Sequence, residues 1–275
     1  GLCGGTAMTL VQAEGVPDYE IVFSKAKTSD YCLVIPVINE GERIGKLLNK
    51  IQTQRIDRIC DIILCDGGST DGSLEPEKLC RLGVKVLLVK KGAGRLSSQL
   101  RCAYHFALGR AYEGILTIDG NNKDDPAPIP AFIENLTEGY DFVQASRFIA
   151  GGEAVNTPAS RTLAIRLLHA PLLSAASGFH WTDTTQGFRA YSARLLLDPR
   201  VDVFRDVFRN YELLAYLSYR APKLGFRCIE MPSRRVYPAG KVPTKISFVK
   251  GNAEVFKVLV TTCLGKYNPE LEKTL

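Results

Sequence analysis

The run YCLVIPV at Tyr31–Val37 is apolar throughout and is followed almost at once by the polar residues Asn39 and Glu40. An uninterrupted apolar run of this length is typical of a strand that is buried on both faces, as in a parallel sheet. Further strands are predicted at residues 61–65, 84–89, 114–118 and 140–146, which are rich in apolar residues. Segments with helical spacing of apolar residues separate them. The alternation predicts an α/β fold with a mostly parallel central sheet flanked by helices.

The sequence predicts that the chain is divided into three parts. Residues 1–29 form an N-terminal extension that contains a short hairpin, residues 30–240 form the α/β domain, and residues 241–275 form an amphipathic helix and a tail. The expected helices cover residues 40–54, 94–110, 128–138, 161–177, 211–220 and 245–264, and a further strand covers residues 226–231. Because the last helix follows the sheet, we expect a C-terminal helical elaboration.

Composition limits the classes of function. The 275 residues include 45% hydrophobic and 23% charged residues, the mix of a globular protein. The formal net charge of +6 is spread along the chain and suits anionic small ligands or an anionic membrane surface. Zinc-finger spacing and interleaved basic and aromatic residues are both absent from the sequence, so nucleic acid is not an expected partner.

The lack of recognisable targeting signals and the pattern of cysteines predict the cellular compartment. No apolar stretch approaches the roughly 18–20 residues of a membrane-spanning helix, and the N-terminus lacks a basic segment followed by an apolar one. The eight cysteines form no C-x-x-C pair, and we expect buried, reduced thiols. These features predict a cytoplasmic protein, at most resting on the inner face of the membrane, and they leave a homo-oligomer open.

Polar clusters follow the predicted strands where each strand ends. They cover residues 39–40, 66–73, 90–95 and 119–125. The carboxyl ends of parallel strands meet at one edge of a sheet, and ligands bind there. The sequence therefore predicts one ligand site built from four loops.

Two of these clusters suit a nucleotide and its phosphates. Asp66 can accept hydrogen bonds from a base, and Gly67 allows close approach of the backbone; an ordinary capped turn is the alternative. Lys91 and Arg95 flank glycines directly before a helix, a plausible phosphate cradle, although a solvated turn would have the same composition.

The segment TIDGNNKDD, residues 117–125, carries the oxygen ligands of a hard cation. Asp119, Asn121 and Asp124 can bind Mg²⁺ or Mn²⁺ and leave positions open for phosphate oxygens. An acidic loop that caps the next helix is the alternative. We expect the diphosphate of a nucleotide ligand to bind at this segment.

Together these motifs resemble the family 2 glycosyltransferases of the GT-A fold, and among them the polyprenyl-phosphate glycosyltransferases such as dolichol-phosphate-mannose synthases. The resemblance covers about residues 31–260. It is carried by PVINE at residues 36–40, DGGSTDGS at 66–73, DGN at 119–121, ASR at 145–147, DTTQGFR at 183–189, and EMP at 230–232 followed by Arg234 and Arg235.

The motifs and the resemblance together predict roles for individual residues. Donor binding would involve Pro36, Asn39, Glu40, Asp66, Gly67, Lys91, Arg95, Asp119, Gly120, Asn121 and Lys123. Phosphates of the donor or acceptor would be bound by Arg147, Arg189, Arg234 and Arg235. The predicted catalytic residues are Asp119, Arg189 and Asp183, the last as a base for a hydroxyl acceptor. The metal would be bound by Asp119 and Asn121, with Asp124 as a further candidate.

The metal motif departs from the family pattern. Asn121 replaces the second aspartate, and Lys123 stands where the polyprenyl-phosphate enzymes often have glutamine. A neutral ligand beside a cation should weaken metal binding. Two hypotheses follow: Lys123 partly replaces the metal's charge, or Asp124 or Asp125 supplies the missing carboxylate.

The predicted function is inverting transfer of a sugar from a UDP- or GDP-sugar to a polyprenyl-phosphate or glycan acceptor in cell-envelope polysaccharide or glycoconjugate synthesis. The helix at residues 245–264 would contact a membrane surface or pack on the core. The alternatives are a non-catalytic nucleotide-sugar-binding protein and a nucleotidyltransferase. The latter would require a glycine-rich basic loop directly after the first strand of the domain, where this chain has Asn39 and Glu40.

Overall fold

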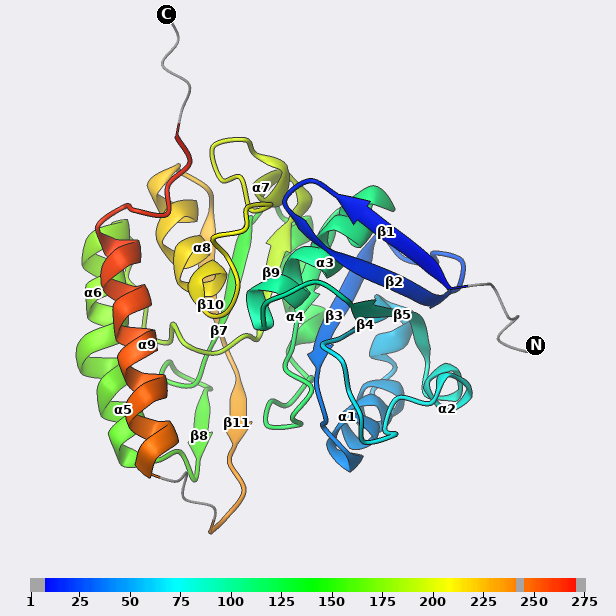
Figure 1. Cartoon of the computed structure of the whole chain (residues 1–275). Coiled ribbons are helices and arrows are strands. Elements are labelled where there is room, and N and C mark those ends of the chain that lie inside the picture. Colours follow the sequence, from blue (N-terminus) through cyan, green and yellow to red (C-terminus); the bar gives the residue numbers. More distant parts are fainter. Residues whose placement is uncertain (1–7, 241–244, 271–275) are drawn as a thin grey trace, which may run out of the picture.

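A nine-stranded sheet forms the centre of the molecule, and helices pack on both of its faces (Figure 1). The computed structural model describes residues 8–240 and 245–270. The strand order is β1-β2-β5-β4-β3-β6-β9-β7-β10, and β8 and β11 form a separate two-stranded sheet. The α/β fold predicted from the alternation of strands and helices is confirmed.

The strands of the central sheet are β1 (Thr9–Ala13), β2 (Val16–Ser24), β3 (Tyr31–Val37), β4 (Asp61–Asp66), β5 (Val84–Lys90), β6 (Gly114–Thr117), β7 (Phe142–Ser146), β9 (Arg189–Ser192) and β10 (Cys228–Pro232). The small sheet consists of β8 (Glu153–Val155) and β11 (Arg234–Val236).

The helices are α1 (Glu42–Thr53), η1 (Ile56–Arg58), α2 (Pro76–Arg81), α3 (Leu96–Gly109), α4 (Ile129–Thr137), α5 (Ala159–Ala164), η2 (Ile165–His169), α6 (Ala170–Ser177), α7 (Ala193–Leu197), α8 (Glu212–Lys223) and α9 (Lys245–Cys263). The α5, η2 and α6 segments follow one another without a break, and η2 is a π-helical turn within them. π-Helical turns of this kind are frequent at functional sites.

Four parallel strands bring their carboxyl ends to one edge. β3 pairs in parallel with β4 and with β6, and β4 pairs in parallel with β5. The clusters after these strands therefore lie along a single edge, as expected. β9 runs antiparallel between β6 and β7; with only four residues it has no apolar run that marks it in the sequence.

Alternate residues of β3 enter two different cores. Cys32 and Val34 pack with residues of α3 and α8, whereas Leu33, Ile35 and Val37 pack with residues of α1 and α4. Both sets are buried, because side chains alternate across a strand and helices cover both faces. This explains why the run shows no polar alternation.

The hairpin expected in the N-terminal extension is present as β1 and β2. β2 pairs antiparallel with β5, so the hairpin extends the central sheet at its edge. At the turn, Gly15 has a φ of 70°, and a Cβ there would lie 2.0 Å from the carbonyl oxygen of Phe204. Only glycine allows the hairpin to approach residue 204 this closely.

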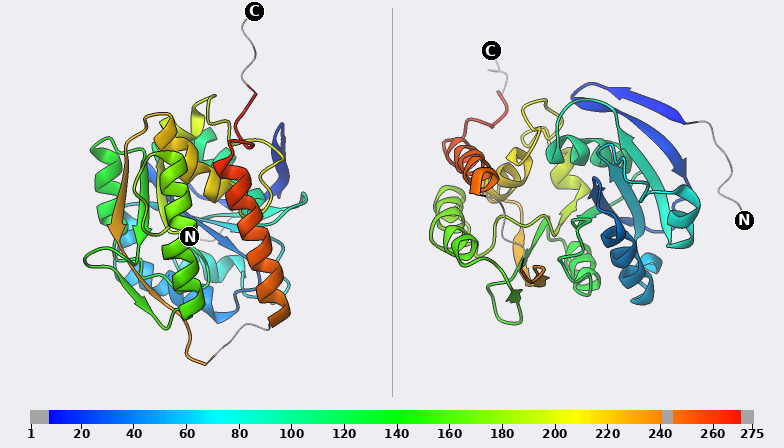
Figure 2. Two further views of the ribbon diagram at one scale, coloured as in Figure 1. Left: turned by 90° about the vertical axis from the view of Figure 1, so that its left-hand side faces the viewer. Right: turned by 60° about the horizontal axis from the view of Figure 1, so that its bottom comes forward.

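The C-terminal helix α9 lies beside α6 and α8 (Figures 1 and 2). Val258 and Leu259 are buried against the core, while Phe256 and Val260 are exposed. The helix therefore has one packed face and one apolar face that is open. None of the helices in the described part of the chain is long and apolar enough to cross a membrane.

Among the described residues, six cysteines are free thiols. Cys32, Cys60, Cys65 and Cys102 are buried, and Cys228 and Cys263 are partly exposed. Cys80 is disulfide-bonded, so the expectation of reduced thiols is wrong for this residue. Cys3 lies outside the described residues.

Candidate active site

The loops after β3 and β4 are tied together at the carboxyl edge of the sheet. The Asn39 side-chain oxygen accepts a hydrogen bond from the backbone N–H of Thr70 at 2.8 Å, and the Asn39 N–H donates to the Ser69 hydroxyl at 3.0 Å. Asn39 has a left-handed φ of 47°, which asparagine tolerates better than most residues. The Glu40 carboxylate accepts from Arg43 Nε at 2.9 Å. The two loops thus form one wall.

Asp66 organises the glycine-rich turn in that wall. Its Oδ1 atom accepts hydrogen bonds from the N–H groups of Gly68 and Ser69 and from the Ser69 hydroxyl, at 2.7–3.0 Å. The Asp66 side chain is mostly buried at the end of β4. The carboxylate therefore has a fixed position from which it can meet a ligand.

Gln99 of α3 supports the same wall from behind. Its amide nitrogen donates to the carbonyl oxygens of Val37 and Cys65 at 3.0 and 3.1 Å, which joins the ends of β3 and β4. A Cβ on Gly67 would lie 3.0 Å from this nitrogen. Gly67 therefore leaves room for the bridge, in addition to any contact with a ligand.

Two glycines allow close packing around residue 119. A Cβ on Gly187 would lie 2.8 Å from Asp119 Oδ1, and a Cβ on Gly120 would lie 2.6 Å from a Val37 methyl group and 3.1 Å from the Pro36 carbonyl oxygen. The backbone after β6 thus packs tightly against the end of β3 and the segment before β9. This packing fixes the position of Asp119.

Asn121 and Lys123 are engaged within the protein. The Asn121 side-chain oxygen accepts from the Lys123 N–H at 3.1 Å, and the Lys123 ammonium lies 4.5 Å from the centre of the Tyr237 ring. Burial lowers the pKa of Lys123, and the charge of Arg235 lowers it further. A cation–π contact holds the lysine at the side of the motif.

Arg235 joins the carboxylates of this segment. Its Nη1 atom lies 2.6 Å from Asp124 Oδ2 and 3.6 Å from Asp119 Oδ2. Burial raises the pKa of the Asp124 carboxyl to about 6, although Arg235 acts in the opposite direction. The buried Asp124 Oδ1 has no hydrogen-bond partner among the described residues.

A second buried ion pair lies nearby. Arg147 Nε and Nη2 donate to the two oxygens of Asp183 at 2.8 and 3.1 Å, and both side chains are at most 1% exposed. Gln186 also donates to Asp183, at 2.7 Å. This arrangement argues against Asp183 as a general base, because its oxygens already accept from the protein. The catalytic role stays an untested prediction.

Arg189 is also enclosed by protein groups. Its guanidinium donates to the carbonyl oxygens of Gln186, Leu214 and Thr184 and to the hydroxyl of Tyr191. The residue is fully buried, and it does not line the cavity described next. Its predicted contact with phosphates therefore has no support from this geometry.

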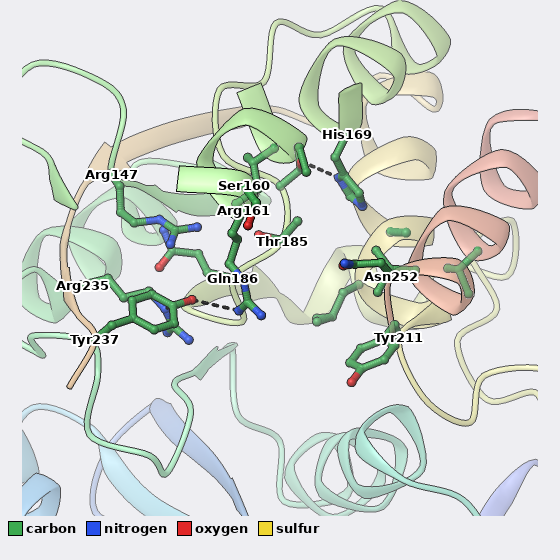
Figure 3. A pocket seen from close by; sticks show the side chains of 17 residues that line it. Arg147, Ser160, Arg161, His169, Thr185, Gln186, Tyr211, Arg235, Tyr237 and Asn252 are labelled. Carbon is green, nitrogen blue, oxygen red and sulfur yellow. Dashed lines mark hydrogen bonds between the residues drawn. The ribbon is translucent and has the colours of Figure 1, made fainter. Parts of the chain in front are cut away.

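A cavity of about 240 Å³ opens beside these ion pairs (Figure 3). Arg147, Arg161, Arg235 and Tyr237 lie at one end, and His169, Tyr211 and Asn252 lie toward the other. Arg147 Nη1, which is buried, has no partner among the residues that the structure describes. One side of the cavity is mostly apolar and is lined by Ala164, Ile165, Leu214, Ala215, Val255 and Val258.

Tyr237 connects the cations at that end. Its hydroxyl lies 3.0 Å from Arg161 Nη1 and 3.5 Å from Arg235 Nε. Burial acts to raise the pKa of Tyr237, but the guanidinium groups of Arg235 and Arg161 outweigh it and lower the pKa to about 8. The lowered pKa thus reflects the positive charge of these two guanidinium groups beside the Tyr237 hydroxyl.

His169 contributes a neutral imidazole to the cavity. Burial lowers its pKa to about 4, and its Nδ1 atom lies 2.6 Å from the Thr184 hydroxyl. Sequence reasoning missed His169, Arg161 and Tyr237. A signal was present: Arg161, Ile165 and His169 follow helical spacing, and Tyr237 lies two residues after Arg235 on an extended segment.

Three of the predicted basic residues lie outside this group. Lys91 forms an ion pair with Glu20 of β2 at 3.4 Å. Arg95 is exposed at the start of α3, and Arg234 forms an exposed ion pair with Glu153 at 2.8 Å. The structure therefore brings together Asp119, Lys123, Asp124, Arg147 and Arg235.

Comparison with known proteins agrees with this architecture. The family model for glycosyl transferase family 2 matches residues 32–198. An undecaprenyl-phosphate mannosyltransferase of Micrococcus luteus is 26% identical over 204 residues, 72% of this chain and 80% of the relative. A dolichyl-phosphate hexose transferase of Haloferax volcanii is 28% identical over 243 residues, 86% of this chain and 94% of the relative.

Solved structures share the fold. Glucosyl-3-phosphoglycerate synthase of Mycobacterium tuberculosis with phosphoglyceric acid has a TM-score of 0.60 at 17% identity, over 86% of this chain and 80% of that one. The same enzyme with Mn²⁺, UDP and its product has a TM-score of 0.58 at 16% identity, over the same shares. These similarities confirm the expected GT-A fold. The chain is a glycosyltransferase, and it belongs to glycosyl transferase family 2.

Proposed function

We propose that the chain transfers a sugar from a UDP- or GDP-sugar to the phosphate of a polyprenyl lipid. One observation carries this proposal: a cavity lined by Arg235, which lies 3.6 Å from Asp119, has guanidinium groups at one end and a mostly apolar side. A lipid phosphate matches these two parts, because its anion would face the guanidinium groups and its hydrocarbon chain would face the apolar side. The names of the two relatives described above describe enzymes that transfer sugars to such lipid phosphates.

The donor would bind along the carboxyl edge of the sheet. Asp66 and the wall formed by the β3 and β4 loops would hold the base and ribose, and the segment around Asp119 would hold the diphosphate. Asn39 and Asp66 support this placement because hydrogen bonds within the wall fix both side chains.

The acceptor phosphate would bind at Arg147. Its Nη1 atom is buried, lines the cavity and has no partner among the described residues, although Asp183 holds the rest of the guanidinium. A buried, unpaired guanidinium nitrogen is costly, and a phosphate oxygen would satisfy it. Arg161 and Arg235 would add positive charge.

A phosphate acceptor also suits the state of Asp183. An anionic phosphate oxygen can attack the anomeric carbon without a general base, whereas a sugar hydroxyl needs one. Asp183 is fully buried and bonded to Arg147. We therefore favour the lipid phosphate over a glycan hydroxyl. Direct displacement would invert the anomeric carbon.

The lipid chain would leave the cavity toward a membrane surface. At about 240 Å³ the cavity is small for a whole lipid. Around it, the segment α5–α6, α9 and the residue after α9 expose large apolar side chains: Leu163, Leu167, Leu168, Leu172, Phe256, Val260 and Leu264. Exposed apolar groups on neighbouring helices are typical of a membrane contact. Flotation with anionic vesicles tests this contact, and Leu167→Glu should weaken it.

The test of the function is a transfer assay with purified chain, UDP- and GDP-sugars, and either a polyprenyl phosphate or a panel of saccharides. We expect transfer to the lipid phosphate, with an inverted anomeric configuration by NMR. Transfer to saccharides alone would contradict the proposal.

A pair of variants tests the role of Arg147. Arg147 and Arg166 both stack on Phe148, at 5.2 and 5.4 Å from the ring centre, but Arg166 does not line the cavity. Arg147→Met should lower kcat/KM for the lipid phosphate roughly 10- to 100-fold, the value of a charge-assisted hydrogen bond, and Arg166→Met should change it little. If Arg147→Met does not fold, Arg147→Lys provides the comparison.

A further inference from the structure

The Arg235 guanidinium lies between the two carboxylates of the predicted metal motif. Its Nη1 atom is 2.6 Å from Asp124 and 3.6 Å from Asp119. Arg235 and Asp124 are buried, and the Asp119 side chain is 25% exposed. A positive charge that belongs to the protein thus lies against Asp119, and Arg235 also lines the cavity described above.

Backbone hydrogen bonds hold Arg235 in this position. The N–H of Asp125 donates to the Arg234 carbonyl oxygen at 3.0 Å, and the N–H of Val236 donates to the Lys123 carbonyl oxygen at 2.8 Å. These bonds flank Arg235 on both sides, and β11 also pairs with β8. Arg235 is therefore part of a paired segment, with its backbone fixed.

The same residues do not fit a divalent metal ion. The Asn121 oxygen already accepts from the Lys123 N–H. Across residues 8–240 and 245–270, no group of three or more His, Cys, Asp or Glu side chains could hold a metal. An ion bound at Asp119 would also be repelled by the charges of Arg235 and Lys123. Mg²⁺ that is bound through substrate phosphates still uses one or two protein carboxylates, and here Arg235 lies against both candidates, Asp124 and Asp119.

We propose that Arg235, with Lys123 beside it, is a built-in cation that binds the donor diphosphate in place of a divalent metal. This inference rests on the proposed function only in requiring a nucleotide-sugar donor. The bond from the anomeric carbon to the β-phosphate oxygen breaks as the acceptor oxygen bonds to that carbon, and the electron pair stays on the diphosphate. A fixed guanidinium stabilises that added negative charge and needs no proton transfer.

The test measures nucleotide binding and Mn²⁺ binding separately. Binding of UDP and GDP is followed by calorimetry in EDTA and in Mn²⁺, and free Mn²⁺ is followed by EPR. The wild type should bind its nucleoside diphosphate with a Kd that differs less than twofold between EDTA and Mn²⁺, as expected for a site whose cation is supplied by the protein. Its EPR signal should remain that of free Mn²⁺.

Arg235→Gln and Arg234→Gln form a matched pair. The two arginines are adjacent, but Arg234 is exposed and bonds Glu153, away from the motif. Arg235→Gln should weaken nucleotide binding roughly 10- to 100-fold in EDTA. In this variant Asp119 and Asp124 are no longer paired with Arg235, so they should bind added Mn²⁺. The EPR signal of free Mn²⁺ should therefore fall, and part of the nucleotide affinity should return. Arg234→Gln should behave as the wild type.

Two further variants keep the test decisive if Arg235→Gln does not fold. Arg235→Lys retains the charge and should retain metal-free binding, and the double change Asp124→Asn with Arg235→Gln removes both members of the buried pair. A wild type that binds nucleotide only with Mn²⁺ would overturn this inference and leave the proposed function intact. Absence of UDP and GDP binding under both conditions would overturn both.

Discussion

The wall formed by the loops after β3 and β4, where we propose that the donor binds (the donor wall), and the cavity are held together by different bonds. In the donor wall, Asp66 accepts from residues two and three positions away, at an edge open to solvent. Around the cavity, Arg147 pairs with Asp183 across 36 positions and Arg235 with Asp124 across 111 positions, all of them buried. The difference teaches that a charge in the wall can be changed at small cost to the fold, whereas a charge at the cavity also stabilises it.

The largest effect is expected from breaking a buried ion pair. Asp183→Ala leaves Arg147 buried and unpaired, so the free energy of unfolding should fall by about 3–5 kcal/mol. Glu153→Ala removes an Arg–carboxylate contact of the same 2.8 Å length, but its two side chains are 50% and 56% exposed, and the loss should be about 0–1 kcal/mol. Urea unfolding measures both. Equal losses would contradict the view that burial makes the Arg147–Asp183 pair the stronger contributor to stability.

A pH-dependent effect is expected next, from His169. Its pKa is lowered to about 4 by burial, while the unfolded chain titrates near 6.5. Between these values the unfolded chain binds more protons, so this residue lowers stability as pH falls from about 6.5 to 4, by at most ~3 kcal/mol. His169→Gln should remove this loss, measured as the difference from wild type in urea unfolding at each pH.

Asp124 contributes in the opposite direction: its pKa is raised to about 6, so its contribution to stability is lost as pH rises from about 4 to 6. This contribution is the same in wild type and variant, and it cancels when the two unfolding free energies are subtracted. The control variant is His180→Gln, at an exposed loop position. A His169→Gln curve that runs parallel to the wild type would contradict the assignment.

The smallest effect is expected in the donor wall and concerns binding. Asp66→Asn keeps an oxygen for the turn but removes the negative charge, so the Kd for UDP or GDP should rise roughly tenfold, about 1.4 kcal/mol. Lys91→Ala removes a residue that pairs with Glu20, and it should change that Kd less than twofold. Calorimetry measures both. A larger effect at Lys91 would restore the phosphate cradle predicted at residues 90–95.

Much of the wall could be predicted because its causes are local. An apolar run such as Tyr31–Val37 predicts a strand buried on both faces, and alternation with helices predicts parallel pairing. Parallel pairing then places Asn39, Asp66 and Asp119 at one edge. Each step depends on neighbours in the chain, which a sequence displays directly.

The cavity could not be predicted in the same way. Nothing in the sequence around Arg147 and Arg189 distinguishes the arginine with an unpaired nitrogen from the one enclosed by carbonyl oxygens. The four-residue strand β9 is too short to carry a pattern, yet it inserts between β6 and β7.

The sequence by itself determined the family, the fold and the edge at which the donor motifs gather. Only the tertiary structure decided that Arg235 lies between Asp119 and Asp124, that Asp183 is bonded to Arg147, and that Lys123 stacks on Tyr237. The physical reason is that strand and helix patterns arise from neighbouring residues, whereas the partner of a buried charge is set by packing between distant segments.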